Sequence, residues 1–219
     1  SHGGALFLAA QEVVKKGREL AAKHLEVGAQ DIEFKDGNFS VPGTDLKVGL
    51  LELSKVYAKN GVSELDTQYA GPPCRSFPTG AHVAEVEVDA QTGEVEIMSY
   101  TGVDDCGNII NHTLAEAQVH GGVMQGLGQV MGEVCIYDQN GQMLTGSFMD
   151  YCMPRADDLK HLALYDRPIP SPNNVLGVKG VGEAGTTGSV PTLANAIIDA
   201  IRSTGVHHMD VPFSPTRVW

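Results

Sequence analysis

The sequence predicts an α+β fold of two subdomains, in which mostly antiparallel sheets pack against helices. Strand-like segments occur in neighbouring pairs joined by tight turns, and helical segments separate these pairs without forming regular βαβ units. A stretch rich in proline and glycine, DTQYAGPPCRSFPTGA at 66–81, has no hydrophobic period and is predicted to be a loop. We therefore expect an N-terminal subdomain at 1–70 and a C-terminal subdomain at 71–219.

The N-terminal subdomain is predicted to contain a helix, a hairpin and a second helix. Apolar residues recur on one face over 5–27, and Gly28 follows where a helix C-cap is typical. Asp36-Gly37 lies between two short strand-like runs, which is a strong signal for a hairpin. The second helix is expected over 49–60, ending at an Asn-Gly pair.

The first half of the C-terminal subdomain is predicted to be a hairpin followed by a long helix. The segments at 82–89 (HVAEVEVD) and 95–105 (VEIMSYTGVDD) alternate between apolar and polar residues, which indicates antiparallel strands with one buried face. The segment at 111–134 has a helical pattern despite glycines at 121, 122, 126 and 128. Each interior glycine costs a helix about 0.5–1 kcal/mol relative to alanine, so we expect a neighbour to pack directly against this backbone.

The second half is predicted to hold a hairpin, an irregular stretch and a last helix. The hairpin is expected in CIYDQNGQMLTGSF, with its turn at Asn140-Gly141. Prolines interrupt 153–178, where no element is predicted, and the last helix is expected over 191–204.

Charge and composition exclude several classes of partner. Lysine and arginine total 15 and aspartate and glutamate total 27, a formal charge of −12, which argues against nucleic acid and anionic membranes. The chain contains no apolar run of the ~20 residues that a membrane span needs. The N-terminal stretch lacks the basic region of a signal peptide, so a cytoplasmic protein is expected.

The four cysteines do not predict a metal site. Cys74, Cys106, Cys135 and Cys152 are widely spaced and form no CxxC pair. We expect free thiols that are buried or shielded, and no metal ligands from this chain.

The segment GVKGVGEAGTTGS, at 177–189, is the strongest local signal for chemistry. Its five glycines allow backbone amides to approach a ligand closely, and it leads into a helix N-terminus, which favours anions. Glu183 is the single carboxylate among these small residues and is a candidate general base. The spacing fits neither the dinucleotide nor the P-loop template. An ordinary loop with a favourable charge at a helix start remains the alternative.

A second signal is HGGVMQGLGQ, at 120–129. Gln125 stands among glycines, and its amide offers a donor and an acceptor for an oxo or phosphate group. The alternative is tight helix packing through small residues, with Gln125 at the rim. Asp104 and Asp105 are adjacent on a strand and should face opposite sides, in capping and strand-end roles. Packing, capping or surface roles are predicted for His112, His120, His207 and His208.

Five segments in this order resemble a known family: DDCGNIIN, AEAQVHGGVMQGLGQ, DYCMPRADDL, PSPNNVLGVKGVGEAGT and SPTRVW. The pattern is similar to the large subunits of molybdenum hydroxylases, which include xanthine dehydrogenase, aldehyde oxidase, nicotinate-type and carbon monoxide dehydrogenases. The resemblance runs over essentially the whole chain and is most specific over 81–219. One departure is Asn111-His112, where the family pattern has Asn-Pro.

The resemblance implies the second molybdenum-cofactor-binding domain of such a large subunit. The cofactor would be molybdopterin, in some members as the cytosine dinucleotide, with Glu183 as the catalytic base. The reaction would be the oxidation of an aldehyde or aromatic N-heterocycle, with water as the oxygen source. The positions that match the cofactor-binding residues of the family are Gly122, Gln125, Lys179, Gly180, Val181 and Gly182.

The resemblance also implies partners. The large subunits are much longer, so the remainder of the large subunit, with iron–sulfur and flavin (FAD) subunits or domains, would complete the enzyme. Alone, the chain is expected to be inactive and to expose a surface that favours self-association. Two alternatives remain: a non-catalytic scaffold domain, and a cofactor-independent hydrolase using Glu183 with His120.

Overall fold

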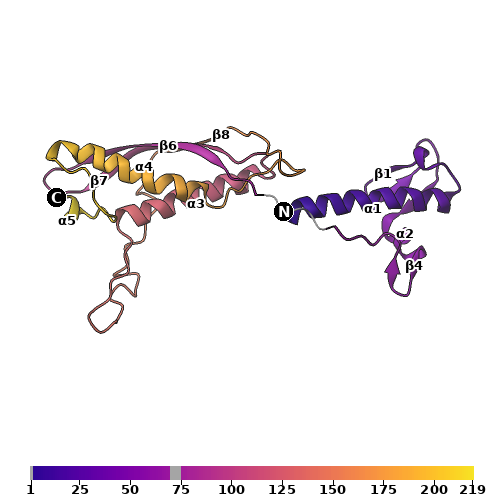
Figure 1. Cartoon of the computed structure of the whole chain (residues 1–219), viewed down its shortest axis with the longest axis horizontal. Coiled ribbons are helices and arrows are strands. Elements are labelled where there is room, and N and C mark those ends of the chain that lie inside the picture. Colours follow the sequence, from indigo (N-terminus) through magenta and orange to yellow (C-terminus); the bar gives the residue numbers. More distant parts are fainter. Residues whose placement is uncertain (1, 70–74) are drawn as a thin grey trace. The chain divides into compact units, whose positions relative to one another are not determined.

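The structure is a computed structural model that describes residues 2–69 and 75–219 (Figure 1). The chain divides into two compact units, Ser1–Cys74 and Arg75–Trp219. No helix in the described residues is long and apolar enough to cross a membrane.

The N-terminal unit is one long helix on a small antiparallel sheet of order β1-β2-β3, followed by a short helix and a two-stranded hairpin. Its elements are α1 (His2–Leu25), the 3₁₀ turn η1 (Ala29–Asp31), β1 (Glu33–Lys35), β2 (Asn38–Ser40), β3 (Lys47–Gly49), α2 (Leu50–Val56), β4 (Ala58–Lys59) and β5 (Val62–Ser63).

Two turns of this unit have the same backbone conformation. Asp36 and Gly37 have φ of 50° and 78° and join β1 to β2, so the predicted hairpin is confirmed. Asn60 and Gly61 have φ of 54° and 80° and join β4 to β5. The prediction of a helix over 49–60 is therefore wrong at its end, because two successive residues of positive φ form a hairpin turn.

The core of the N-terminal unit lies between α1 and the sheet. A Cβ atom added at Gly17 would lie 2.2 Å from Cζ of Phe39, so the helix backbone packs directly on this buried ring. The buried apolar residues are Leu20, Ala21, Ile32, Phe39, Val48, Leu53 and Leu65.

The C-terminal unit contains a three-stranded sheet of order β6-β7-β8. Its elements are β6 (Thr79–Val88), β7 (Val95–Asp105), α3 (His112–Met131), β8 (Leu162–Asp166), α4 (Ala184–Ile201), η2 (Arg202–Thr204) and α5 (Pro215–Val218). β6 and β7 form the predicted antiparallel hairpin, whereas β8 pairs with β7 in parallel. The sequence did not predict β8, because prolines flank its five residues.

Helices α3 and α4 lie side by side along this sheet (Figure 1). Tyr100 and Ile97 of β7 are buried with Val123 of α3 and with Leu193 and Ile197 of α4. The opposite face of the hairpin carries exposed side chains such as Val83. The prediction of one buried face is confirmed, and both helices cover that face.

The last helix begins earlier than predicted, at Ala184 rather than at residue 191. Pro191, the residue at the predicted start, lies inside α4. The first turns of α4 contain Gly185 and Gly188 because a side chain at either position would collide with a neighbour. At Gly185 the neighbour is the α3 backbone, and at Gly188 it is the His82 ring.

Residues 132–161, here called the arm, connect α3 to β8 and include a loop that projects from the unit (Figure 1). The predicted hairpin is present only as a turn: Tyr137 and Met143 form an isolated bridge, and Gly141 has a φ of 81°. Several large apolar side chains of the arm are exposed, among them Phe148 (86%) and Met149 (94%).

Candidate functional site

The two segments singled out in the sequence lie against each other. The Gln118 side-chain amide donates to the Gly182 carbonyl at 2.9 Å, which joins α3 to the loop before α4. The Thr186 hydroxyl in the first turn of α4 donates to the Gly122 carbonyl at 3.0 Å. The glycine-rich loop and the glycine-rich helix therefore form one surface.

The glycines of α3 have different environments. A Cβ atom at Gly122 would lie 3.0 Å from Cα of Gly185, and one at Gly126 would lie within van der Waals radii of the Ser189 hydroxyl. This is the tight helix packing left open as an alternative by the sequence. The Gly122 α-carbon lies against α4, and this packing accounts for the glycine without a ligand. A cofactor contact at Gly122 therefore stays a prediction. Gly121 is exposed and has open space where a side chain would be.

Gln118, Gly121 and Gln125 share one side of α3. Residues three, four and seven apart lie on the same helix face, and Gln118 marks the face beside the loop. Gln125 is exposed, two turns from Gln118 and about 10 Å along the axis. It remains a predicted cofactor ligand on the surface that carries the loop.

The loop at 180–183 is open on its outer side. Among residues 2–69 and 75–219, no atom lies within 4 Å of a Cβ atom added at Gly180 or Gly182, and neither glycine has a positive φ. Val181 is half-buried and packs against the core. Glu183 is the N-cap residue of α4, and its exposed side chain makes no capping hydrogen bond. The side chain of Glu183 is open to solvent in this chain, because the residues around it are small.

Lys179 is held by an aspartate. Its ammonium group lies 2.5 Å from Oδ2 of Asp105, and both side chains are largely buried. The Lys179 ammonium and the Ile169 amide, in that order, are the main causes that lower the pKa of Asp105 to about 2. The backbone amide of Lys179 donates to the Cys106 carbonyl at 2.9 Å. The loop is therefore anchored at Lys179 through both its backbone and its side chain.

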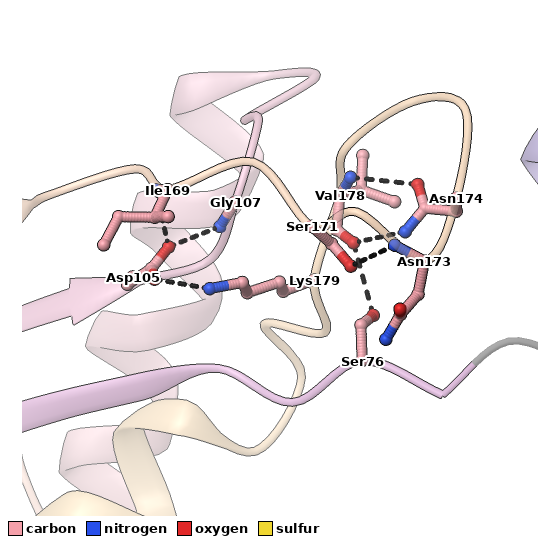
Figure 2. Close-up of polar contacts among 9 residues, drawn as sticks. All are labelled: Ser76, Asp105, Gly107, Ile169, Ser171, Asn173, Asn174, Val178 and Lys179. Atoms are coloured by element: carbon pink, nitrogen blue, oxygen red, sulfur yellow. Dashed lines mark hydrogen bonds and ion pairs between the residues drawn. The ribbon is translucent and has the colours of Figure 1, made fainter.

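The preceding residues form a compact network of turns (Figure 2). Asn174 and Val178 bond reciprocally, side chain to backbone, at 2.8 and 3.1 Å. The Ser76 hydroxyl donates to the Val178 carbonyl at 3.2 Å. Gly107 has a φ of 65° and lies so close to Gly177 that any side chain would collide with the Gly177 carbonyl. Contacts from Asn174, Ser76 and Gly107 therefore hold the base of the loop.

A hollow of about 400 Å³ lies between the 106–111 segment, the first turns of α3 and the loop. Its walls are mostly apolar and include Ile109, Ile110, Leu114, Val181 and Gly182. An apolar hollow beside open glycine backbone and a helix N-terminus suits a ligand that has an anionic part and an uncharged part.

The two aspartates at the end of β7 face opposite sides, as predicted. Asp104 lies 3.1 Å from Nε2 of His82 on β6, whereas Asp105 binds Lys179. His82 was not singled out in the sequence, since a lone histidine in an alternating strand gives no signal of its partner. Gln118 was not singled out either, because Gly182, to which it donates, lies 64 positions away in the sequence.

The other histidines do not assemble with Glu183. His120 pairs with Glu116 on the same helix at 3.8 Å. It lies two residues from Gln118, about 200° around α3, and so points away from the loop. This geometry argues against the hydrolase alternative. His208 pairs with Asp210 on the surface, as predicted for its position.

The cysteines are only partly as expected. Cys106 is buried, and burial, followed by the nearby carboxylates, raises the pKa of its thiol. Cys135 and Cys152 are exposed, so the expectation of shielding is wrong for them; Cys74 lies outside the described residues. Within residues 2–69 and 75–219, no group of three or more histidine, cysteine or acidic side chains is arranged to hold a metal ion.

Similar proteins agree on one family. The model of the molybdopterin cofactor-binding domain matches residues 1–160. The chain is 34% identical to the carbon monoxide dehydrogenase large chain of Hydrogenophaga pseudoflava and 33% identical to subunit gamma of the 6-hydroxypseudooxynicotine dehydrogenase complex of Paenarthrobacter nicotinovorans. Each match covers 99% of this chain and 28% of the relative, so the chain spans about a quarter of their length.

Solved structures agree with this. The CO dehydrogenase of Oligotropha carboxidovorans superposes with a TM-score of 0.80 at 32% identity, over 99% of this chain and 28% of that one. Quinoline 2-oxidoreductase of Pseudomonas putida 86 gives a TM-score of 0.76 at 29% identity, over 95% and 28%. The α+β fold expected from the resemblance is therefore confirmed. The family model covers more than half of the chain, and the chain belongs to the molybdopterin cofactor-binding domain family.

Proposed function

We propose that this chain is the second cofactor-binding part of a molybdenum hydroxylase and that Glu183 is the catalytic base. The observation that carries the proposal is the open backbone at Gly180 and Gly182. The described part of the fold does not require glycine at either position, because an added Cβ atom would meet none of its atoms and neither φ is positive. A ligand that packs against this backbone accounts for both glycines.

The residues present fit molybdopterin. The loop amides and the N-terminus of α4 offer donors to its anionic groups, and Gln125 offers an amide on the adjoining helix face. Gly180, Val181 and Gly182 would lie along the cofactor, and the backbone of Lys179 would precede them. When bound, the molybdenum cofactor would supply the two-electron oxidation.

Glu183 would supply the proton transfer. Its carboxylate is exposed at the start of α4 and is free of side-chain capping, so it can accept a proton from the water that provides the oxygen of the product. The surrounding small residues leave room for a substrate beside it. Enclosure of Glu183 would come from the rest of the enzyme, because this chain leaves it open.

The partners follow from the same proposal. Phe148 and Met149 of the arm are almost fully exposed, which suits a surface that another part of the protein covers. We infer that the remainder of a large subunit covers it and that iron–sulfur and flavin (FAD) subunits or domains accept the electrons in the cytoplasm. Without them the chain would self-associate and be inactive.

The substrate class is proposed to be an aldehyde or an aromatic N-heterocycle. Relatives named as a nicotine 6-hydroxylase and as a quinoline 2-oxidoreductase support the heterocycle. Relatives named as carbon monoxide dehydrogenases make carbon monoxide the second candidate. The substrate pocket would be formed largely by residues outside this chain.

The test is made on the assembled hydroxylase, purified with the complete large subunit and its partner subunits. Molybdenum content and dye reduction are measured with an aldehyde, quinoline, a purine and carbon monoxide. Glu183→Gln should retain molybdenum and lose about 10²–10⁴-fold in kcat, the usual contribution of a general base. Glu94→Gln is the matched control, since Glu94 is exposed in the turn at the far end of the β6–β7 hairpin.

Each outcome decides between the candidates. Retained metal with lost turnover in Glu183→Gln alone supports the base. Normal turnover per molybdenum in Glu183→Gln removes Glu183 from the chemistry. Absence of molybdenum from the assembled wild type leaves the non-catalytic scaffold as the function.

A further inference from the structure

Asp105 connects three segments at the base of the loop (Figure 2). Its carboxylate accepts from the Lys179 ammonium at 2.5 Å, the Ile169 amide at 2.9 Å and the Gly107 amide at 3.0 Å. The side chain is 10% exposed. One largely buried carboxylate therefore holds the end of β7, the segment after β8 and the loop that leads to Glu183.

The loop between Lys179 and α4 has few other attachments. On their side-chain sides, Gly180 and Gly182 meet no atom of the part of the chain that the structure describes, and the Gly182 carbonyl accepts a bond from Gln118. A segment with two glycines has wide conformational freedom, so its anchors determine its path. The path from Lys179 to Glu183 is thus set at one end by Asp105 and by the Lys179 amide bond to Cys106, in the middle by the half-buried Val181, and at the other end by α4 with Gln118.

The pairing also determines the charge of the loop. The Lys179 side chain is 14% exposed and its ammonium group is directed at Asp105, so the pair is neutral as a unit. The loop then presents backbone amides to a ligand and does not present a free cation.

We propose that Asp105 is a positioning residue that acts through Lys179, fixing the path of residues 179–183 and thereby the location of Glu183. This inference rests on the proposed function of Glu183. The Lys179 side chain then binds Asp105, and only the backbone of Lys179 is available to the cofactor. Neither residue would touch the reacting atoms.

The test uses Asp105→Asn, Lys179→Met and the double variant in the assembled hydroxylase. The first readout is hydrogen–deuterium exchange of peptides spanning 176–187, which does not depend on activity. Exchange at 179–183 should rise in all three variants. Asp166→Asn is the control, since Asp166 is an exposed aspartate at the end of the neighbouring strand β8.

The second readout is kinetic. At wild-type molybdenum content, kcat should fall about 10–100-fold with KM nearly unchanged, and the double variant should match the single ones, because both residues act through one contact. Lys179→Met leaves the Ile169 and Gly107 amides bonded to Asp105. It therefore still tests the proposal if Asp105→Asn does not fold. Loss of molybdenum in Lys179→Met but not in Asp105→Asn would overturn the proposal, since the ammonium would then bind the cofactor.

Unchanged exchange in the single variants would also overturn it, as would unchanged turnover per molybdenum while Glu183→Gln is inactive. If Glu183→Gln is instead fully active, the proposed function fails, and the exchange measurement still decides whether Asp105 holds the loop.

Discussion

Nε2 of His82 lies 3.1 Å from the Asp104 carboxylate, and this contact joins β6 to β7 beneath the first half of α4. The other ring nitrogen, Nδ1, lies 2.6 Å from the Tyr100 hydroxyl. The His82 side chain is only 3% exposed, and burial raises the pKa of the Tyr100 hydroxyl, which therefore stays protonated. Every polar atom of this buried imidazole has a partner.

Tyr100→Phe should lower the free energy of unfolding by about 1–3 kcal/mol, because it leaves a buried ring nitrogen unpaired. The measurement is urea unfolding of the chain. Tyr165→Phe is the control, since Tyr165 is 60% exposed on β8 and should change stability by less than about 0.5 kcal/mol. Equal effects of the two variants would show that the Tyr100–His82 bond contributes nothing.

Gly122→Ala and Gly121→Ala should have opposite effects, although the residues are neighbours on α3. The methyl group at Gly122 would lie 2.9 Å from the Thr186 amide nitrogen, so the helices must separate, at a cost of about 1–3 kcal/mol. At Gly121 the methyl group enters open space and should raise the free energy of unfolding by about 0.5–1 kcal/mol. Thermal unfolding of both variants checks the pair; a stabilised Gly122→Ala would contradict the packing.

Acid should remove the stabilisation that Asp105 provides. The pKa of Asp105 is lowered from 3.8 to about 2 in the folded chain, so its contribution is complete above about pH 4 and is lost as the pH falls through 2. The difference in unfolding free energy between wild type and Asp105→Asn should therefore shrink over this window. In Lys179→Met the largest cause of the lowered pKa is absent, so the pKa of Asp105 should lie closer to 3.8, and the loss of stability in acid should be smaller and complete at a higher pH.

A constant difference between wild type and Asp105→Asn from pH 5 to pH 2 would mean that the carboxylate is not held as described. Urea midpoints at half-unit steps of pH are sufficient to distinguish the two results.

Gly182→Ala should leave the stability of the chain within about 0.5 kcal/mol of wild type, because the added methyl group meets nothing. In the assembled hydroxylase the same variant should retain less molybdenum, since the methyl group would occupy space assigned to the cofactor. Gly49→Ala is the control, at a φ of −74° with its nearest neighbouring atom at 3.6 Å. Full molybdenum content in Gly182→Ala would contradict the proposed contact between Gly182 and the cofactor.

Local patterns predicted much of the fold. The alternation over 82–105 gave the hairpin and its buried face, and the glycines of α3 correctly indicated a neighbour against the backbone. The same patterns misplaced the start of α4, because Pro191 resembles a helix start while the helical glycines before it depend on contacts with α3 and His82. β8 is stable only as a partner of β7, so its sequence alone does not indicate it.

Candidate residues for the site could be proposed from the sequence, but their contacts could not. Glu183 and Gln125 could be named from their glycine-rich surroundings, yet the residues that hold the loop lie far away in the chain. Asp105 is 74 positions from Lys179, and Gln118 is 64 positions from Gly182. Such pairs depend on tertiary packing, for which no local period exists.

The contact between Gly122 and Gly185 brings the backbones of α3 and α4 together without any intervening side chain. Helices separated by side chains can slide or rotate as rotamers change, whereas two backbones in contact have no such adjustable layer. The helix backbone at Gln125 and the first turn of α4 are therefore carried as a single rigid piece. In the proposed enzyme, differences in substrate range would then arise from the protein placed around this piece.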